Sequence, residues 1–105
     1  MADLQQKDWT KLLFEDNNSV VLDVRTLDEV EELGIIPEAI HIDIFKGQGF
    51  IDEIQKLDTS KNYFVYCKAG GRSAQACAIM NQLGFEKTYN LLGGFTEWEG
   101  KVNQI

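Results

Sequence analysis

The chain has 105 residues, 44% of them hydrophobic and 26% charged, and its formal net charge is −7 at pH 7. This length predicts one domain over residues 1–105 with a single hydrophobic core, and the composition favours neither a disordered nor a membrane-embedded class of protein. The negative charge argues against nucleic acid and anionic membranes as partners, because binding to phosphates needs a cluster of positive side chains.

The predicted elements alternate between helices and strands along the chain. In chain order they are a helix over residues 3–14, a strand over 20–24, a helix over 26–32, a strand over 39–43, a helix over 50–57, a strand over 63–66, a helix over 73–83, a strand over 88–91 and a helical turn around 95–98. Thr26 and Glu29 form a capping-box pattern, and Gly34 and Gly84 lie where helices are expected to end. This alternation predicts an α/β fold, in which an open, mostly parallel sheet is covered by helices on both faces.

The sequence also carries expectations about compartment and redox state. No apolar stretch approaches the roughly 18 residues of a membrane-spanning helix, and the start MADLQQKDW lacks the basic-then-apolar order of a signal peptide. We therefore expect a cytoplasmic location. A disulfide between Cys67 and Cys77 is not expected, because the predicted helix carries Cys77 away from the loop.

The segment YCKAGGRS places Cys67 at the carboxyl end of a predicted strand, where ligands bind in open α/β sheets. Gly70 and Gly71 allow the backbone to curl, and the helix predicted to begin near Ser73 points its free N–H groups inward. These groups form a cradle for an anion, and a sulfur at its centre has a lowered thiol pKa. The pattern therefore predicts that Cys67 is a nucleophilic thiolate.

A free cysteine is most often a small buried residue, so the reactive interpretation needs support from its surroundings. For Cys67 the support comes from the strand end, the glycine pair, the helix start and the flanking Lys68 and Arg72. Cys77 lies on the apolar stripe of its helix without a basic neighbour, and we expect it to pack in the core.

Such a loop serves two chemistries, attack on a phosphoryl or arsenyl group and attack on a sulfane sulfur. Four residues lie between Cys67 and Arg72. Cysteine-dependent phosphatases of the tyrosine type have a longer loop at this point, which gives a wider ring for a tetrahedral oxyanion. The shorter loop of this chain therefore favours attack on a sulfane sulfur over attack on a phosphoryl or arsenyl group.

Several motifs resemble those of the rhodanese-like sulfurtransferase family. The loop YCKAGGRS matches the family's C-x-x-G-x-R-S pattern and is the most specific of them. The segment LDVRTLDEV is similar to the family's strand-to-helix signature with Asp23 and Arg25, and GIIPEAIHI is similar to a G-H-I-P-G-A-I segment. A looser match, NLLGGFTEW, lies near the end, so the resemblance covers almost the whole chain.

The resemblance implies a five-stranded parallel sheet flanked by helices and a sulfurtransferase reaction without metal or organic cofactor. In that reaction Cys67 attacks a donor such as thiosulfate or a persulfide, becomes a persulfide, and passes the sulfur to a thiophilic acceptor such as cyanide, a thiol or a partner protein. The substrate-binding residues implied by the resemblance are Lys68, Ala69, Gly70, Gly71, Arg72 and Ser73.

Two positions depart from the family pattern. Ile35 or its neighbour stands where the family has a histidine, and Glu38 replaces the glycine after the proline, so this loop is free to take a different path. The predicted helix after Arg25 is acidic, which argues against thiosulfate as the natural donor. His41, alone on a predicted strand, is assigned no catalytic role.

The charged residues near the loop allow two interpretations each. Asp23 and Arg25 either face the active loop or brace it, and we expect bracing because a buried charge is usually paired. Arg72 either holds an anionic donor or clamps a nearby acidic residue, and both remain open. Lys68 either aids an anionic substrate or is simply solvated.

The sequence leaves three hypotheses about function. The first is a small sulfurtransferase that uses Cys67 as the persulfide carrier. The second is a module of the same fold that relays sulfur or docks on a larger protein with little turnover. The third, a small cysteine phosphatase or arsenate reductase, is disfavoured by the short ring.

Overall fold

The computed structural model describes residues 2–105, in which five strands form one parallel sheet. The strands lie in the order β1-β5-β4-β2-β3. Their bounds are β1 (Ala2–Leu4), β2 (Ser19–Asp23), β3 (Ile40–His41), β4 (Asn62–Tyr66) and β5 (Thr88–Leu91). The predicted parallel sheet is therefore confirmed.

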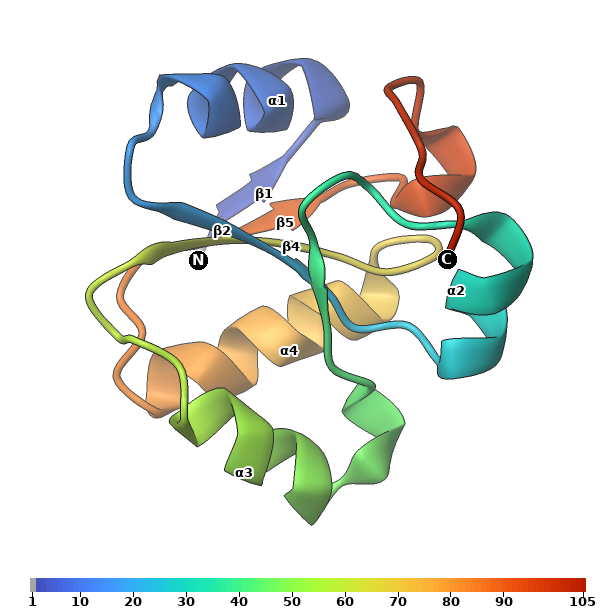
Figure 1. Ribbon diagram of the computed structural model, residues 1–105. Coiled ribbons are helices and arrows are strands. Elements are labelled where there is room, and N and C mark those ends of the chain that lie inside the picture. The colour runs from blue at the N-terminus through green and yellow to red at the C-terminus, as the bar shows by residue number, and fades with distance from the viewer. Residues whose placement is uncertain (1) are drawn as a thin grey trace.

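Helices cover both faces of this sheet, as predicted. They are α1 (Gln6–Glu15), α2 (Leu27–Leu33), α3 (Gln48–Gln55) and α4 (Gly71–Gln82), with 3₁₀ turns η1 (Ile44–Lys46) and η2 (Phe95–Glu97). In Figure 1, α1 lies on one side of the sheet, and α3 and α4 lie on the other. Within residues 2–105, no helix has the length and apolar character needed to cross a membrane.

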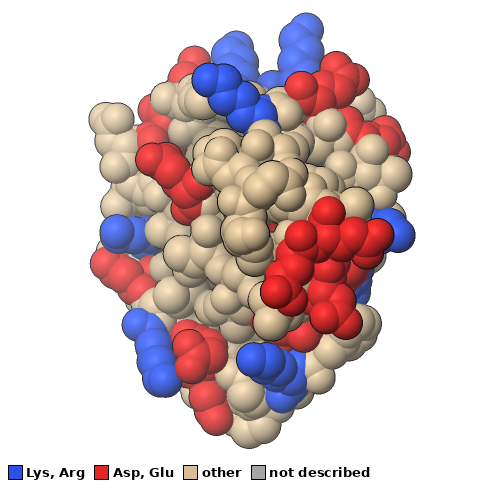
Figure 2. Space-filling view, turned by 45° about the vertical axis from the view of Figure 1, so that its right-hand side comes forward, with Lys and Arg blue, Asp and Glu red and all other residues tan. Residues whose placement is uncertain are grey.

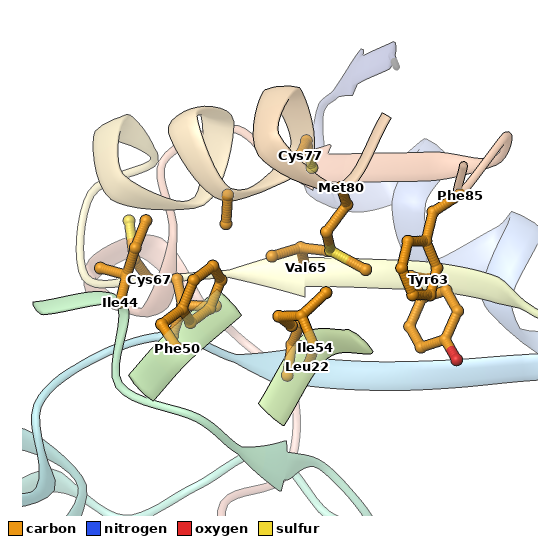
Figure 3. Packing of buried hydrophobic residues seen from close by; sticks show 12 residues of the cluster. Leu22, Ile44, Phe50, Ile54, Tyr63, Val65, Cys67, Cys77, Met80 and Phe85 are labelled. Carbon is orange, nitrogen blue, oxygen red and sulfur yellow. The ribbon is translucent and has the colours of Figure 1, made fainter. Parts of the chain in front are cut away.

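Strand β4 is buried on both faces, which explains its nearly continuous apolar sequence. Tyr63 and Val65 belong to the core between the sheet and helices α3 and α4, part of which Figure 3 shows. Phe64 and Tyr66 belong to the core on the α1 side, where both contact Trp9 edge to face. Alternating side chains of one strand thus join the two cores, and the loop that follows β4 starts from a rigid base.

The N-terminal segment differs from the helix predicted over residues 3–14. Ala2–Leu4 forms the edge strand β1, paired in parallel with β5, and α1 begins only at Gln6. Leu4 fits the helical spacing, yet it packs against the α1-side core from a strand. The partner strand lies at the other end of the chain, so local periodicity gave no sign of the pairing.

Other element boundaries also differ from the prediction. β3 covers two residues because Asp43 accepts a hydrogen bond from the Phe45 backbone N–H at 2.8 Å and caps η1. α3 begins and ends two residues earlier than expected. α4 begins at Gly71 rather than near Ser73, because Gly70, with a φ of +108°, already serves as its N-cap.

The capping box of α2 is confirmed. The Glu29 backbone N–H donates to the Thr26 hydroxyl at 3.3 Å, and the Thr26 backbone N–H donates to the Glu29 carboxylate at 3.0 Å. Gly34 ends the helix with a φ of +86°. A side chain there would meet the C-terminal segment, since an added Cβ would lie 2.8 Å from the Asn103 carbonyl oxygen.

Glu38 has a φ of +69°, alone among the non-glycine residues of the described chain in being positive. The loop after Pro37 therefore has a backbone that favours glycine, although the sequence has a glutamate.

Replacing Glu38 with glycine is expected to raise the free energy of unfolding by about 0.5–1 kcal/mol. Relief of the left-handed strain outweighs the greater freedom that glycine gives the unfolded chain. Urea denaturation measures this, with the exposed α2 residue Glu31 changed to glycine as the matched control. That control is expected to lose about 1 kcal/mol, because its backbone is helical. A loss of stability in both variants would contradict the account.

Candidate functional site

Cys67 directly follows β4, at the carboxyl edge of the sheet. The chain turns through Lys68–Gly70 and enters α4 at Gly71. The left-handed conformation of Gly70 brings its backbone N–H within 3.0 Å of the Cys67 Sγ, to which it donates. The loop thus folds back onto the sulfur at Gly70.

The two cysteines differ in their electrostatic surroundings. Burial by itself raises the pKa of the Cys67 thiol, but hydrogen bonds from the side chain and backbone of Ser73 and from the backbone of Gly70 and Ala69 outweigh it. The pKa of Cys67 is therefore held below the usual value of a cysteine. Burial raises the pKa of Cys77 to about 11. Figure 3 shows Cys67 near the end of β4 and Cys77 on α4, and both are free thiols in the described chain.

Ser73 connects the sulfur to a buried polar network. Its Oγ lies 2.5 Å from the Asn90 Oδ1, 3.2 Å from the Gly70 carbonyl oxygen and 3.3 Å from the Cys67 Sγ. The Asn90 amide is oriented by its own Nδ2, which donates to Asp3 at 2.9 Å and to the Gly70 carbonyl at 3.2 Å. A hydroxyl donates one proton at a time, so the Ser73 proton is shared between Asn90, the loop backbone and the sulfur.

Replacing Ser73 with alanine is expected to raise the pKa of Cys67, because the hydrogen bond from the Ser73 hydroxyl to the thiolate is lost. The thiolate fraction then grows only at higher pH, and reactivity near neutral pH falls. The ultraviolet absorbance of the thiolate, titrated as the difference from a Cys67→Ser protein, measures this pKa. An unchanged midpoint would show that the Ser73 hydroxyl does not stabilise the thiolate.

The segment after β5 supports the active loop. The Phe95 N–H donates to the Cys67 carbonyl at 2.8 Å, and the Thr96 N–H donates to the Lys68 carbonyl at 2.9 Å. Gly94 allows this close approach, because an added Cβ would lie 2.5 Å from the Lys68 carbonyl oxygen and 2.6 Å from that of Cys67. Two parts of the chain thus meet with no room for a side chain between them.

Asp23 and Arg25 form a buried ion pair beside this support. The Arg25 Nη2 donates to the Asp23 carboxylate at 2.6 Å and to the Gly34 carbonyl at 2.7 Å. The Arg25 guanidinium carbon also lies 4.2 Å from the centre of the Phe95 ring and 5.5 Å from that of Tyr66. The pair joins the ends of β2, β4 and α2 to the segment after β5, which is the arrangement expected of a bracing pair.

Arg72 clamps an acidic residue, one of the two roles that the sequence left open. Its Nη1 and Nη2 donate to the two carboxylate oxygens of Glu29 at 2.6 Å and 2.8 Å. Lys68, Ala69 and Gly71 are exposed at the rim of the loop, whereas Ser73 and Gly70 are buried near the sulfur.

Three residues that matter for this site were assigned no part in it from the sequence. The sequence places Asn90 in a strand and Gly94 at a strand break, both within the segment NLLGGFTEW, and it gives Glu29 as a capping residue and one of the acidic residues after Arg25. The available signals were the polar side chain of Asn90 within a buried strand and the position of Gly94 directly after another glycine. Neither signal names a partner, because the contacts join distant parts of the chain.

Comparison with known sequences gives the same family as the motifs. The family model described as Rhodanese-like domain matches residues 6–101. YtwF from Bacillus subtilis, named as a sulfurtransferase, is 40% identical over 88 residues, which cover 83% of this chain and 80% of that protein. The thiosulfate sulfurtransferase GlpE from Coxiella burnetii is 35% identical over 80 residues, which cover 76% of this chain and 71% of GlpE.

Solved structures show the same fold. A rhodanese-like domain protein from Staphylococcus aureus matches with a TM-score of 0.83 and 24% identity, covering 100% of this chain and 99% of that one. A protein from Staphylococcus saprophyticus matches with a TM-score of 0.81 and 28% identity, covering 99% of this chain and 100% of the other.

Proposed function

This chain belongs to the rhodanese-like domain family, and we propose that it is a sulfurtransferase that carries sulfane sulfur as a persulfide on Cys67. The observation that carries the proposal is the position of the Cys67 Sγ, which accepts a hydrogen bond from the Gly70 N–H at 3.0 Å inside a loop that lowers its pKa. A thiolate held in this way is both a nucleophile and a good leaving group. We expect it to act in the cytoplasm, where thiols stay reduced.

The proposed reaction has two steps, and neither needs an external oxidant or reductant. In the first, the Cys67 thiolate attacks the sulfane sulfur of the donor, a new S–S bond forms, and the donor's own bond to that sulfur breaks, releasing sulfite or a thiolate with the electron pair. In the second, cyanide, a thiol or a partner protein attacks the outer sulfur, and Cys67 leaves as a thiolate. The proposed reaction needs no metal or organic cofactor, because each electron pair passes between substrate and protein sulfur.

The remaining loop residues bind the transferred sulfur in this proposal. Backbone N–H groups from Lys68 to Ser73 surround the outer sulfur of the persulfide, which carries negative charge. The Ser73 hydroxyl adds a donor, and the contacts from Phe95 and Thr96 hold the loop in shape.

The test is turnover of small substrates. The purified protein is incubated with thiosulfate or an alkyl persulfide in the presence of cyanide, and thiocyanate is measured. Thiocyanate formation with at least one donor, without hydrolysis of an aryl phosphate, is the expected result. Aryl phosphate hydrolysis without sulfur transfer from any donor would overturn the proposal in favour of a phosphatase.

A sulfur-relay module with little turnover is the alternative that the burial of Cys67 favours. The residue is only 1% exposed, so a donor or acceptor has to reach into the loop. In this case the persulfide forms but discharges slowly to cyanide and faster to a protein thiol.

A further inference from the structure

We propose that Glu29 sets the charge class of the sulfur donor by occupying the guanidinium of Arg72. The site then favours donors of low negative charge, such as an alkyl persulfide, over the thiosulfate dianion. The inference rests on the proposed sulfur transfer by Cys67 and names the class of substrate that the same site uses.

The contact between the two residues is bidentate. Both terminal nitrogens of Arg72 donate to Glu29, at 2.6 Å and 2.8 Å, and the two side chains are about one-fifth exposed. A paired fork of this kind is among the stronger polar contacts in proteins, and here the Glu29 carboxylate engages both terminal nitrogens and neutralises the charge of the guanidinium. An anionic donor would therefore meet an arginine whose charge Glu29 already balances, and it would have to displace Glu29 to form the same paired contact.

Glu29 is also fixed from its other side. The Thr26 backbone N–H and hydroxyl donate to the Glu29 Oε1 at 3.0 Å and 3.1 Å. Hydrogen bonding from Arg72, reinforced by Thr26, lowers the pKa of Glu29 to about 2, so it is ionised throughout the physiological range. On its far side the guanidinium carbon of Arg72 lies 5.4 Å from the centre of the Phe45 ring. The ion pair is thus held in place by two elements besides the active loop.

The charge that remains near the entrance is mostly negative. α2 also carries Asp28, Glu31 and Glu32 as exposed side chains, and Asp43 lies close enough to Arg72 to affect its pKa. Figure 2, which turns the α2 side of Figure 1 forward, shows acidic side chains gathered on this face. Lys68 is the cation of the loop that has no such partner among the ion pairs of residues 2–105. A site with one unpaired lysine attracts a dianionic donor less strongly than a site with a lysine and an unpaired arginine.

The test releases Arg72 by the substitution Glu29→Gln. Glutamine keeps the capping box with Thr26, so α2 is expected to remain folded, which circular dichroism checks. The matched control is Glu32→Gln, which removes the same charge from an exposed position of the same helix. The two donors are thiosulfate and the persulfide of N-acetylcysteine methyl ester, each assayed with cyanide.

The expected result is an increase of about tenfold in kcat/KM for thiosulfate in Glu29→Gln, mainly through KM. The change is expected to stay below about twofold for the alkyl persulfide, and below about twofold for either donor in Glu32→Gln. The gain is expected to disappear in the double variant E29Q/R72M, because it depends on the released guanidinium.

Two results would overturn the inference. Equal effects of Glu29→Gln and Glu32→Gln would show a general charge effect rather than release of Arg72. A loss of thiosulfate use in a folded Glu29→Gln protein would show that Glu29 supports the loop without selecting the donor. If the wild type transferred sulfur from neither donor, the proposed function itself would fail, and this inference with it.

Discussion

Replacing Cys67 with serine is expected to abolish sulfur transfer, lowering thiocyanate formation by about a thousandfold or more. A serine hydroxyl stays protonated near neutral pH and forms no persulfide, so neither step of the proposed reaction can proceed. The substitution changes one atom, and the loop keeps the backbone hydrogen bonds that Phe95 donates to Cys67 and Thr96 donates to Lys68. Steady-state turnover with cyanide measures the loss.

The control for this experiment is Cys77→Ala. Cys77 lies in the core between the sheet and α4, where burial raises its pKa to about 11. Its removal is expected to cost about 1 kcal/mol of stability through lost packing and to leave turnover unchanged. Loss of activity in the folded Cys77 variant, with activity retained in the Cys67 variant, would reverse the assignment of the two thiols.

Replacing Gly94 with alanine is expected to lower the free energy of unfolding by about 3 kcal/mol and to reduce sulfur transfer at least tenfold. The new Cβ would meet the carbonyl oxygens of Lys68 and Cys67, and φ at this position is +56°. The loop and the segment from Phe95 must then separate, which breaks two backbone hydrogen bonds that hold the active loop. Urea denaturation and turnover measured together give both effects.

Gly47 offers a matched control for that substitution. Its φ is +57°, but an added Cβ would meet no atom within 4 Å. Gly47→Ala is therefore expected to show the cost of backbone strain alone, about 1–3 kcal/mol, with turnover retained below the unfolding transition. If both alanine variants lost activity to the same degree while folded, contact between Gly94 and the active loop would not be the cause.

Most of the fold could be predicted because its signals are local. Residues 63–66 form a continuous apolar run, which is typical of a strand buried on both faces, and the capping box of Thr26 and Glu29 marks the start of α2. β1 could not be predicted, because its three residues form a strand through pairing with β5.

In the candidate site, too, local features could be predicted from the sequence, whereas contacts between distant residues could not. Cys67 and the glycines after it stand in one short motif at a strand end, and general principles of anion binding are enough to interpret them. The partner of Arg72 lies 43 residues earlier in the chain, and Asp3 lies 87 residues from Asn90. Spacing along the sequence carries no information about which of several carboxylates such a side chain meets, so these contacts required the structure.

The acidic residues of α2 show what the structure adds to the sequence. From the sequence they indicated only that thiosulfate was a doubtful natural donor. The structure distinguishes Glu29, which pairs with Arg72, from Glu31 and Glu32, which are exposed. A general expectation about charge thereby becomes a proposal about one residue.

Intact-mass measurement of the protein after incubation with an alkyl persulfide or thiosulfate tests the central claim most directly. The account predicts a gain of one sulfur atom, about 32 Da, on the wild type and on Cys77→Ala, with none on Cys67→Ser, and loss of the added mass when cyanide is supplied. A gain that persists in Cys67→Ser, or no gain on the wild type with either donor, would contradict the assignment of Cys67 as the sulfur carrier.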